Sequence, residues 1–274
     1  MSEIIKITDI NAKELRPYVS LTEAELRRCE GIFIAESVKV IKIALACGLE
    51  PLSFLMEERQ IEGIGRELIE LSPHTPVYTA SREVLASLTG FELTRGLLAA
   101  MRRPEAKSLD EALKGAKRIA VLERLSDSTN VGAIFRNAAA LGIDAVLLFH
   151  NSAEPLNRRA VRVSMGSVFL VPWAFFDKES FKEPRSAAEY LKQKGFTTAA
   201  LALRDNCINI TDTALKTADK VALFLGAEGD GLSEEMIDAC DYTVKIPMHH
   251  RVDSLNVASA ATIAFWELGE NRAN

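Results

Sequence analysis

The sequence predicts an α/β protein in which a small N-terminal α/β domain precedes a larger C-terminal domain with a parallel sheet. Short apolar runs alternate with helical segments along the chain. Such regular alternation lays strands side by side in parallel, with helices on both faces of the sheet. A polar stretch that contains Pro, Ser and Gly, residues 104–117, separates the two halves. At 274 residues the chain is long enough for two domains.

Composition and charge narrow the classes of protein that the chain can represent. The net charge of −5 argues against a protein coated in basic residues, so any nucleic-acid binding must use local patches. No apolar run reaches the length of a membrane helix, and the first residues lack the pattern of a signal peptide. The cysteines lie outside any metal-binding spacing, which predicts buried thiols in a reduced, cytoplasmic protein: Cys29, Cys47, Cys207 and Cys240.

The first domain is expected to span residues 1–103. A capping-box pattern at Thr22 and Glu25 predicts a helix that ends at Gly31. The remaining pattern predicts strands at 31–35, 51–56, 76–79 and 97–101, and helices at 36–47, 57–71 and 81–88. Five cations are candidates for a patch that grips a phosphate backbone, or are simply solvated surface charge: Lys39, Lys42, Arg95, Arg102 and Arg103.

The second domain is expected to span residues 118–274. Its apolar runs predict strands at 118–122, 145–149, 168–171, 197–202, 221–225 and 242–246. The segments between them predict helices at 131–141, 155–163, 185–194, 233–239 and 254–268. Ligands of parallel sheets bind beyond the carboxyl ends of the strands, so the loops that follow these strands are the candidate site.

A glycine-rich loop, residues 226–231 (GAEGDG), follows the predicted strand at 221–225. Its glycine spacing differs from the dinucleotide fingerprint, and the chain has no P-loop, so a dehydrogenase is disfavoured. The glycines still allow a ligand to approach the backbone closely. Glu228 in their midst either faces that ligand or caps the following helix.

Polar residues also stand at the starts of two helices. Asn130 fits a routine helix cap, but Arg136 lies on an otherwise uncharged, alanine-rich helix. Near the C-terminus, Ser254 or Asp253 fits a cap, whereas Asn256 is a poor helix former in an apolar context. The sequence shows no Ser-His-Asp order, no paired carboxylates and no metal-ligand cluster, so a hydrolase or metal site is not expected.

Three segments in this order resemble the signature motifs of the SpoU (TrmH) RNA ribose methyltransferases, in the SPOUT superfamily. They are residues 130–137 (NVGAIFRN), 225–232 (LGAEGDGL), and 246–248 (IPM) with 254–257 (SLNV); residues 163–167 (VSMGS) also resemble a family segment. The resemblance covers about residues 118–270. It implies a deep trefoil knot in the C-terminal domain, a homodimer whose partner completes the site, and S-adenosyl-L-methionine as the cofactor. Ala227 and the pair His249–His250 depart from common family residues.

The same resemblance implies roles for individual residues. The residues expected to take part in catalysis are Arg136, Asn130, Glu228, Ser254 and Asn256. Those expected to hold the cofactor are Leu203, Gly226, Ala227, Glu228, Gly231, Ile246, Met248, Ser254 and Leu255. Because a guanidinium is a poor base, Arg136 is expected to stabilise the developing alkoxide or to grip a phosphate, with its action as a base left open.

The reaction implied is methyl transfer to a ribose 2′-OH of RNA, which would exclude DNA as a substrate. The first domain resembles the recognition domain that many members carry, which favours ribosomal RNA over transfer RNA. Methylation of a base, and an RNA-binding module with a vestigial site, are the other interpretations. The nucleotide that is modified does not follow from the sequence.

Overall fold

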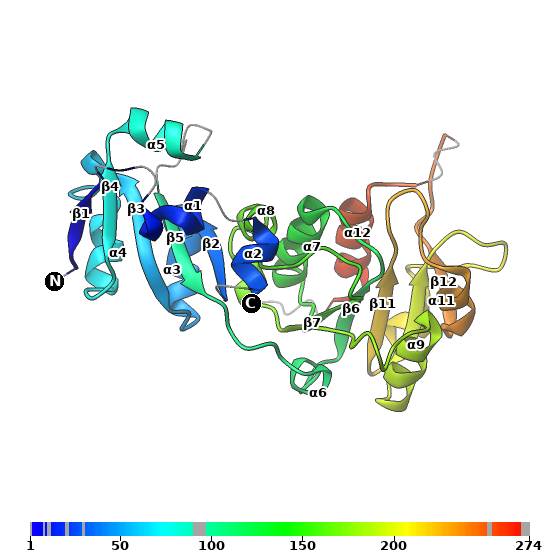
Figure 1. The fold of residues 1–274 in the computed structure, drawn as a ribbon. Coiled ribbons are helices and arrows are strands. Elements are labelled where there is room, and N and C mark those ends of the chain that lie inside the picture. Colours follow the sequence, from blue (N-terminus) through cyan, green and yellow to red (C-terminus); the bar gives the residue numbers. More distant parts are fainter. Residues whose placement is uncertain are drawn as a thin grey trace. The chain divides into compact units, whose positions relative to one another are not determined.

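The computed structural model of this protein describes residues 2–7, 9, 12–19, 22–28, 31–89, 97–250 and 254–269. The chain forms two compact units (Figure 1). The first contains Met1–Glu105 together with Leu156–Phe169, and the second contains Ala106–Pro155 and Leu170–Asn274. The segment Leu156–Phe169, which the sequence pattern places in the C-terminal domain, thus packs within the first unit.

The first unit has a five-stranded sheet in which β5 (Leu97–Arg102) runs antiparallel to both of its neighbours. The strand order is β1 (Ile4–Lys6), β4 (Val77–Ala80), β3 (Pro51–Glu57), β5, β2 (Ile32–Glu36). Its helices are η1 (Lys13–Leu15), α1 (Arg16–Val19), α2 (Glu23–Arg28), α3 (Val38–Ala46), η2 (Glu58–Gln60), α4 (Arg66–Leu71), α5 (Arg82–Thr89), α8 (Arg158–Val163) and η3 (Ser167–Phe169).

The predicted strands at 31–35, 51–56, 76–79 and 97–101 are confirmed within a residue or two. The capping box is also confirmed, because the Thr22 N–H donates to Glu25 Oε2 at 2.8 Å and the Glu25 N–H to Thr22 Oγ1 at 3.3 Å. The single helix expected over 57–71 is wrong. A short 3₁₀ turn and α4 replace it, and Gly65 between them has no room for a side chain, since a Cβ there would lie 2.5 Å from Met56 Sδ.

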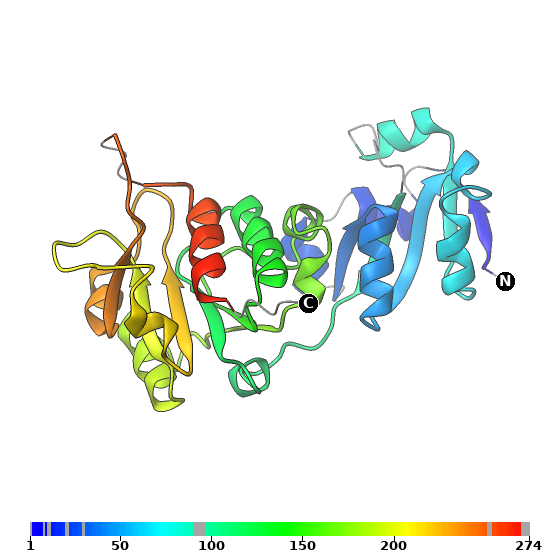
Figure 2. The same ribbon diagram turned by 180° about the vertical axis from the view of Figure 1, so that it is seen from behind.

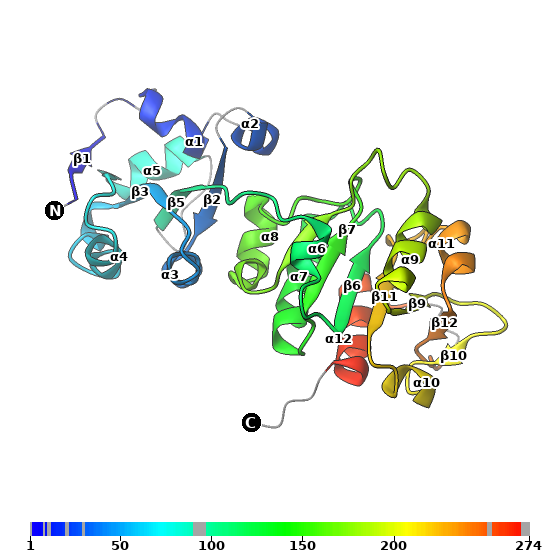
Figure 3. The same cartoon turned by 90° about the horizontal axis from the view of Figure 1, so that it is seen from below.

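The second unit contains a seven-stranded sheet in which every pairing is parallel, so the predicted α/β class is confirmed. The strand order is β10 (Ile208–Asn209), β12 (Tyr242–Lys245), β9 (Thr197–Leu201), β11 (Val221–Leu225), β6 (Arg118–Leu122), β7 (Ala145–Leu148), β8 (Trp173–Phe175). Its helices are α6 (Leu109–Ala112), α7 (Ser128–Ala140), α9 (Pro184–Gln193), α10 (Thr213–Lys216), α11 (Glu234–Ala239) and α12 (Val257–Leu268). Helices α6, α9 and α11 lie on one side of the sheet, and α7, α10 and α12 on the other (Figure 3).

The strand predicted at 168–171 is wrong. That apolar run begins as the 3₁₀ turn η3, after Met165 and Gly166 have reversed the chain with φ values of 53° and 85°, and the strand itself starts only at Trp173. The two-residue strand β10 had no counterpart in the prediction, because it is too short to leave a period in the sequence.

Helices α7 and α12 pack against each other (Figure 2). The Asn137 amide donates to the Ala258 carbonyl at 3.2 Å and to Thr262 Oγ1 at 2.6 Å. Ala258, Ala261 and Ala264 are buried, so the small residues of α12 serve contacts within the chain. None of the helices in the described ranges combines the length and the hydropathy that a membrane span requires.

Candidate active site

The loop that follows β11 closes tightly upon itself. The Gly231 N–H donates to the Ala227 carbonyl at 3.0 Å, and Gly231 has a φ of 68°. A Cβ added at Gly226 would lie 2.2 Å from the Gly231 carbonyl carbon and from the Leu232 nitrogen. Only glycine fits at position 226, so the loop presents bare backbone at the end of a central strand.

Two residues that the sequence did not single out support this loop from the end of β6. Glu123 is buried, and its carboxylate accepts from the Ser233 N–H at 2.9 Å and from the Ser233 hydroxyl at 2.7 Å. Arg124, at a φ of 57°, donates to the Gly231 carbonyl at 3.3 Å. A buried carboxylate requires hydrogen-bond donors such as these. The only hint of this support in the sequence is that Glu123 and Arg124 form a charged pair directly after an apolar strand.

Three of the predicted catalytic residues meet in one hydrogen-bonded cluster. The Asn256 amide donates to Asn130 Oδ1 at 3.0 Å and also to Glu228 Oε1. The side-chain oxygen Oδ1 of Asn256 accepts from the backbone N–H groups of Ala258 and Ser259 at 3.0 and 3.3 Å, which fixes the orientation of its amide. The start of α7, the loop after β11 and the start of α12 are thereby tied together.

The expected helix caps are corrected by these contacts. Asp127 caps α7 by accepting from the Thr129 N–H at 2.7 Å, so Asn130 lies inside the first turn. Asn256 itself caps α12, which therefore begins beyond Ser254, and Asp253 lies outside the described residues. Ser233 caps α11, so Glu228 is not the cap of the following helix. Segments rich in Ser, Thr, Asp and Asn offer several caps, and only the backbone path selects one.

The other two predicted catalytic residues stay outside the cluster. Arg136 is exposed and, within the described part of the chain, forms no hydrogen bond or ion pair. It lies six residues after Asn130, which places it about 9 Å further along the helix axis and on another face. Ser254 is exposed beside the cluster and has no hydrogen-bond partner among the residues described.

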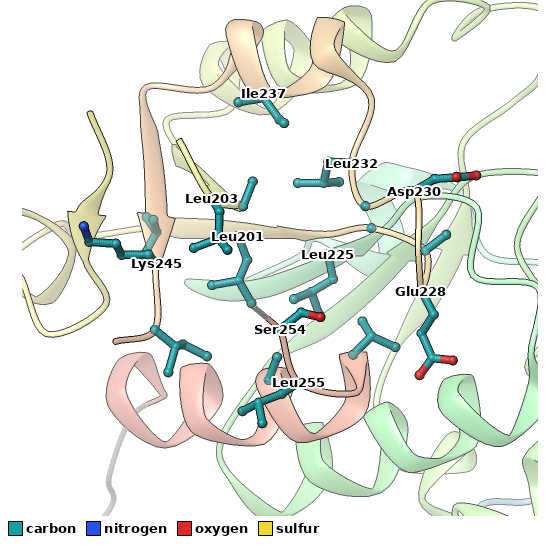
Figure 4. A pocket seen from close by; sticks show the side chains of 18 of the residues that line it. Leu201, Leu203, Leu225, Glu228, Asp230, Leu232, Ile237, Lys245, Ser254 and Leu255 are labelled. Atoms are coloured by element: carbon teal, nitrogen blue, oxygen red, sulfur yellow. The ribbon is translucent and has the colours of Figure 1, made fainter. Parts of the chain in front are cut away.

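A cavity of about 660 Å³ opens beyond the carboxyl ends of β9, β11 and β12 (Figure 4). This volume is in the range of pockets for small molecules, which lies at about 300–1,000 Å³. Leu201, Leu225 and Leu232 form apolar walls, and Glu228 and Asp230 lie at one side of the cavity. All residues predicted to hold the cofactor line it: Leu203, Gly226, Ala227, Glu228, Gly231, Ile246, Met248, Ser254 and Leu255.

Burial makes the Cys240 thiol a poor nucleophile. Cys240 lines a second cavity of about 430 Å³, and burial raises the pKa of its thiol to about 12, so the thiol stays protonated at neutral pH. Cys47 is exposed and Cys207 and Cys240 are only partly buried, which contradicts the expected burial. Cys29 lies outside the described residues. No group of His, Cys, Asp or Glu with a metal-binding arrangement occurs among the residues that the structure describes.

Comparison with known proteins identifies the family. The model of the SpoU rRNA methylase family matches residues 117–266. A tRNA/rRNA methyltransferase of Mycobacterium tuberculosis, described as uncharacterised, is 38% identical over 266 residues, covering 94% of this chain and 85% of that protein. The 23S rRNA (guanosine(2553)-2′-O)-methyltransferase RlmP of Bacillus subtilis is 27% identical over 191 residues, covering 70% of this chain and 71% of that protein.

The fold has a counterpart among solved structures. The AdoMet-bound rRNA methyltransferase from Sinorhizobium meliloti superposes with a TM-score of 0.81 at 23% identity, covering 97% of both chains. The parallel-sheet domain and the N-terminal domain thus recur together in a known architecture. The chain belongs to the SpoU rRNA methylase family, and the resemblance found in its motifs is confirmed.

Proposed function

We propose that this protein transfers a methyl group from S-adenosyl-L-methionine to a ribose 2′-OH of ribosomal RNA. The observation that carries the proposal is the cluster of Asn130, Glu228 and Asn256 at the rim of the cavity beyond β9, β11 and β12. It combines a place for a nucleoside-sized ligand with fixed polar groups beside it. The relatives that act on RNA, among them the 2′-O-methyltransferase RlmP, support the same reaction.

The residues of the cavity fit the proposed cofactor. Gly226 leaves no side chain between the loop backbone and a ligand, and apolar walls suit an adenine ring. The carboxylates of Glu228 and Asp230 suit a sulfonium cation, whereas Lys245 at the same cavity suits a carboxylate. When bound, the cofactor supplies an activated methyl group. We propose that the cofactor is held by the nine predicted residues, all of which line the cavity.

The chain's own residues then have to align and stabilise the reacting ribose. Effective transfer requires the reacting atoms to be held about 3 Å apart, which is the role proposed for Asn130, Glu228 and Asn256 together with Ser254. Arg136 is proposed to stabilise the alkoxide that develops at the 2′-oxygen, with the proton leaving to water or to a neighbouring group. A guanidinium keeps its charge at neutral pH, so its strength is electrostatic rather than basic.

The site is proposed to be completed in a homodimer. Arg136 has no partner among the described residues of its own chain, which supports a role in the site of a second copy. On α12, Ile263 and Trp266 expose 37% and 59% of their surface on one side of the helix, an apolar face that suits burial against a partner. We also propose that the C-terminal domain contains the deep trefoil knot that the resemblance implies.

The choice of RNA is proposed from the domain organisation. Residues 1–103 are taken as the recognition domain, 104–117 as the linker and 118–274 as the methyltransferase domain, an arrangement that favours ribosomal RNA over transfer RNA. Cys47, Cys207 and Cys240 are free thiols, which supports a reducing compartment, the cytoplasm.

The test is methyl transfer in vitro. The protein is incubated with methyl-labelled S-adenosyl-L-methionine and unmodified transcripts of 23S rRNA, 16S rRNA or a tRNA pool, and the RNA is digested to nucleosides. The proposal expects the label on a 2′-O-methylated nucleoside from ribosomal RNA. Label on a base would establish the alternative methylation, label in tRNA alone would replace the substrate, and cofactor binding without transfer would favour a vestigial site.

A further inference from the structure

The crossover segment between β7 and β8, Leu156–Phe169, belongs structurally to the first unit. Its helix α8 packs beside β2 (Figure 1). The Arg158 N–H donates to Glu23 Oε1 at 3.1 Å, and the rings of Phe33 and Phe169 lie 5.6 Å apart. A Cβ added at Gly166 would lie 3.3 Å from Ile43 on α3. The segment is therefore held on the first unit at both of its ends.

This segment is strongly basic in an acidic protein. It contains Arg158, Arg159 and Arg162 and no Asp or Glu, whereas the whole chain has a net charge of −5. Several partly or fully exposed cations elsewhere in the first unit are each paired with a nearby carboxylate. Such pairs are Lys6–Glu58, Lys42–Glu67, Arg66–Glu70 and Arg102–Glu50. On α8, by contrast, the one carboxylate of Glu36 pairs with two of the three arginines, so positive charge is in excess there.

One buried carboxylate orients two of these arginines. Glu36, at the end of β2, is only 5% exposed, and its Oε2 lies 3.3 Å from Arg158 Nη2 and 3.6 Å from Arg162 Nη1. A guanidinium has five N–H donors, so this single contact leaves most donors of Arg162 available, and 46% of that side chain is exposed. The exposed side chain of Arg159 has no partner among the described residues.

The residue that follows Glu36 is strained. Ser37 has a φ of 85° and a ψ of 147°, a region that side chains other than glycine rarely adopt. Its hydroxyl is buried without a hydrogen-bond partner in the described structure. Strain of this kind persists where the surroundings require a fixed backbone, and it clusters at functional positions. Here it fixes the point at which Glu36 leaves the sheet.

We propose that α8 is an RNA-phosphate-binding surface of the first unit, in which Arg159 and Arg162 contact phosphates and Glu36 is a positioning residue. This inference rests on the proposed function, since it takes RNA as the substrate. Guanidinium groups suit phosphate oxygens because their donors form a planar fork. The two arginines are three residues apart on a helix, so their side chains are neighbours that can grip adjacent parts of one backbone.

The test compares the salt dependence of RNA binding. Wild type, Arg159→Gln, Arg162→Gln and the matched control Arg66→Gln are titrated with an end-labelled mixed-sequence RNA oligonucleotide over a range of salt concentrations. Each α8 substitution is expected to reduce the slope of log Kd against log salt by about 0.7–1, the value for one lost phosphate contact, and the control to leave it unchanged. Arg159 has no protein partner for its side chain, so its substitution should not disturb folding.

The outcomes separate this inference from the function on which it rests. If wild type methylates RNA but the slopes of both α8 variants equal that of Arg66→Gln, the phosphate surface is contradicted and the function stands. If wild type transfers no methyl group to RNA, the proposed function itself fails. Cofactor affinity, measured by calorimetry, is expected to be unchanged in all variants.

The role of Glu36 has a test of its own. Removing a negative charge would by simple electrostatics tighten RNA binding, but loss of a positioning residue should weaken it. Glu36→Gln is therefore expected to raise KM for RNA severalfold with kcat at saturating RNA unchanged, and Glu36→Asp to recover part of the loss. Unchanged or tighter RNA binding by Glu36→Gln would contradict the positioning role.

Discussion

Two polar residues of helix α7, one in its first turn and one beyond its middle, differ in how completely they are held. In the first turn Asn130 is buried and accepts a hydrogen bond from Asn256, which also reaches Glu228. Six residues later Arg136 is exposed and has no bonding partner in the described part of the chain. Helix α7 packs on α12, which holds Asn130 in place. A residue that two helices already fix loses little further freedom when a ligand binds.

The difference separates what the single chain pre-organises from what it leaves open to a substrate or, as proposed, to a second copy. The cluster of Asn130, Glu228 and Asn256 is complete without any other molecule. Arg136 keeps its donors and its charge available, which is expected of a group that acts on a substrate or in a second copy of the chain. Substitutions at Arg136 and at Asn256 test the two residues separately.

The largest effect on activity is expected at Arg136, which has no bonding partner in the described part of the chain. Arg136→Ala should lower kcat by about 10²–10³-fold, the usual result of removing one electrostatic stabiliser of a transition state. Cofactor affinity should stay unchanged, because Arg136 does not line the cavity. Single-turnover methyl transfer and cofactor calorimetry measure the two quantities. Near-normal turnover would remove Arg136 from the mechanism.

Mixed dimers test whether that arginine serves a partner. Gly226→Ala should block the cofactor loop, because its Cβ would meet the Gly231 backbone at 2.2 Å. Co-expression of differently tagged Arg136→Ala and Gly226→Ala chains should yield mixed dimers that regain activity which neither variant has alone. Mixed dimers as inactive as the parents would contradict a site shared between copies. Circular dichroism of the Gly226→Ala chain checks its folding.

The hydrogen-bonded cluster of Asn130, Glu228 and Asn256 is tested with a matched pair of substitutions at Asn256. Asn256→Asp keeps the oxygen that caps α12 but loses both amide donations and places a second carboxylate beside Glu228. It should lower kcat about ten- to a hundredfold and keep the cap of α12, since Asn and Asp cap equally well, so that any loss of stability comes from the lost donations and the added charge. Asn256→Ala should also lower the free energy of unfolding, by about 0.5–2 kcal/mol. Equal stability loss in both variants would show that the cap contributes nothing.

The smallest expected effect on activity comes from a change outside α7. Ser37→Gly removes the strain at a φ of 85° and the buried unpaired hydroxyl, so the free energy of unfolding should rise by about 1–3 kcal/mol. Methyl transfer should stay within a factor of two or so of wild type. Denaturant unfolding measures the free energy of unfolding. A lower value for Ser37→Gly than for wild type would mean that the hydroxyl has a partner in solution.

Much of the fold follows from sequence periodicity, because the apolar runs that form β6, β7, β9 and β11 are too regular to mistake. Helix starts were harder to predict. Asp127, Ser128, Thr129 and Asn130 are all good caps, and the structure selects Asp127. The assignment of Leu156–Phe169 to the first unit depends on contacts with residues more than a hundred positions away, which local patterns do not encode.

The candidate site divides in the same way. The hydrogen bond between Asn130 and Asn256 spans 126 positions. The resemblance of motifs places both residues among the catalytic candidates, but nothing in the sequence predicts their contact. Glu123, which supports the glycine loop through Ser233, was missed because a lone carboxylate after a strand has many ordinary explanations. Motif resemblance selects residues that line the cavity or form the cluster beside it, whereas those that support them become visible only in three dimensions.

The most direct measurement compares the ribose methylation of all ribosomal and transfer RNA from cells with and without this protein. Sites are mapped by the resistance of 2′-O-methylated positions to alkaline hydrolysis and by mass spectrometry of nucleosides. The proposed function predicts that a 2′-O-methyl group is lost from ribosomal RNA and returns with wild type but not with Arg136→Ala. Unchanged ribose methylation, or the loss of a base methyl group instead, would contradict it.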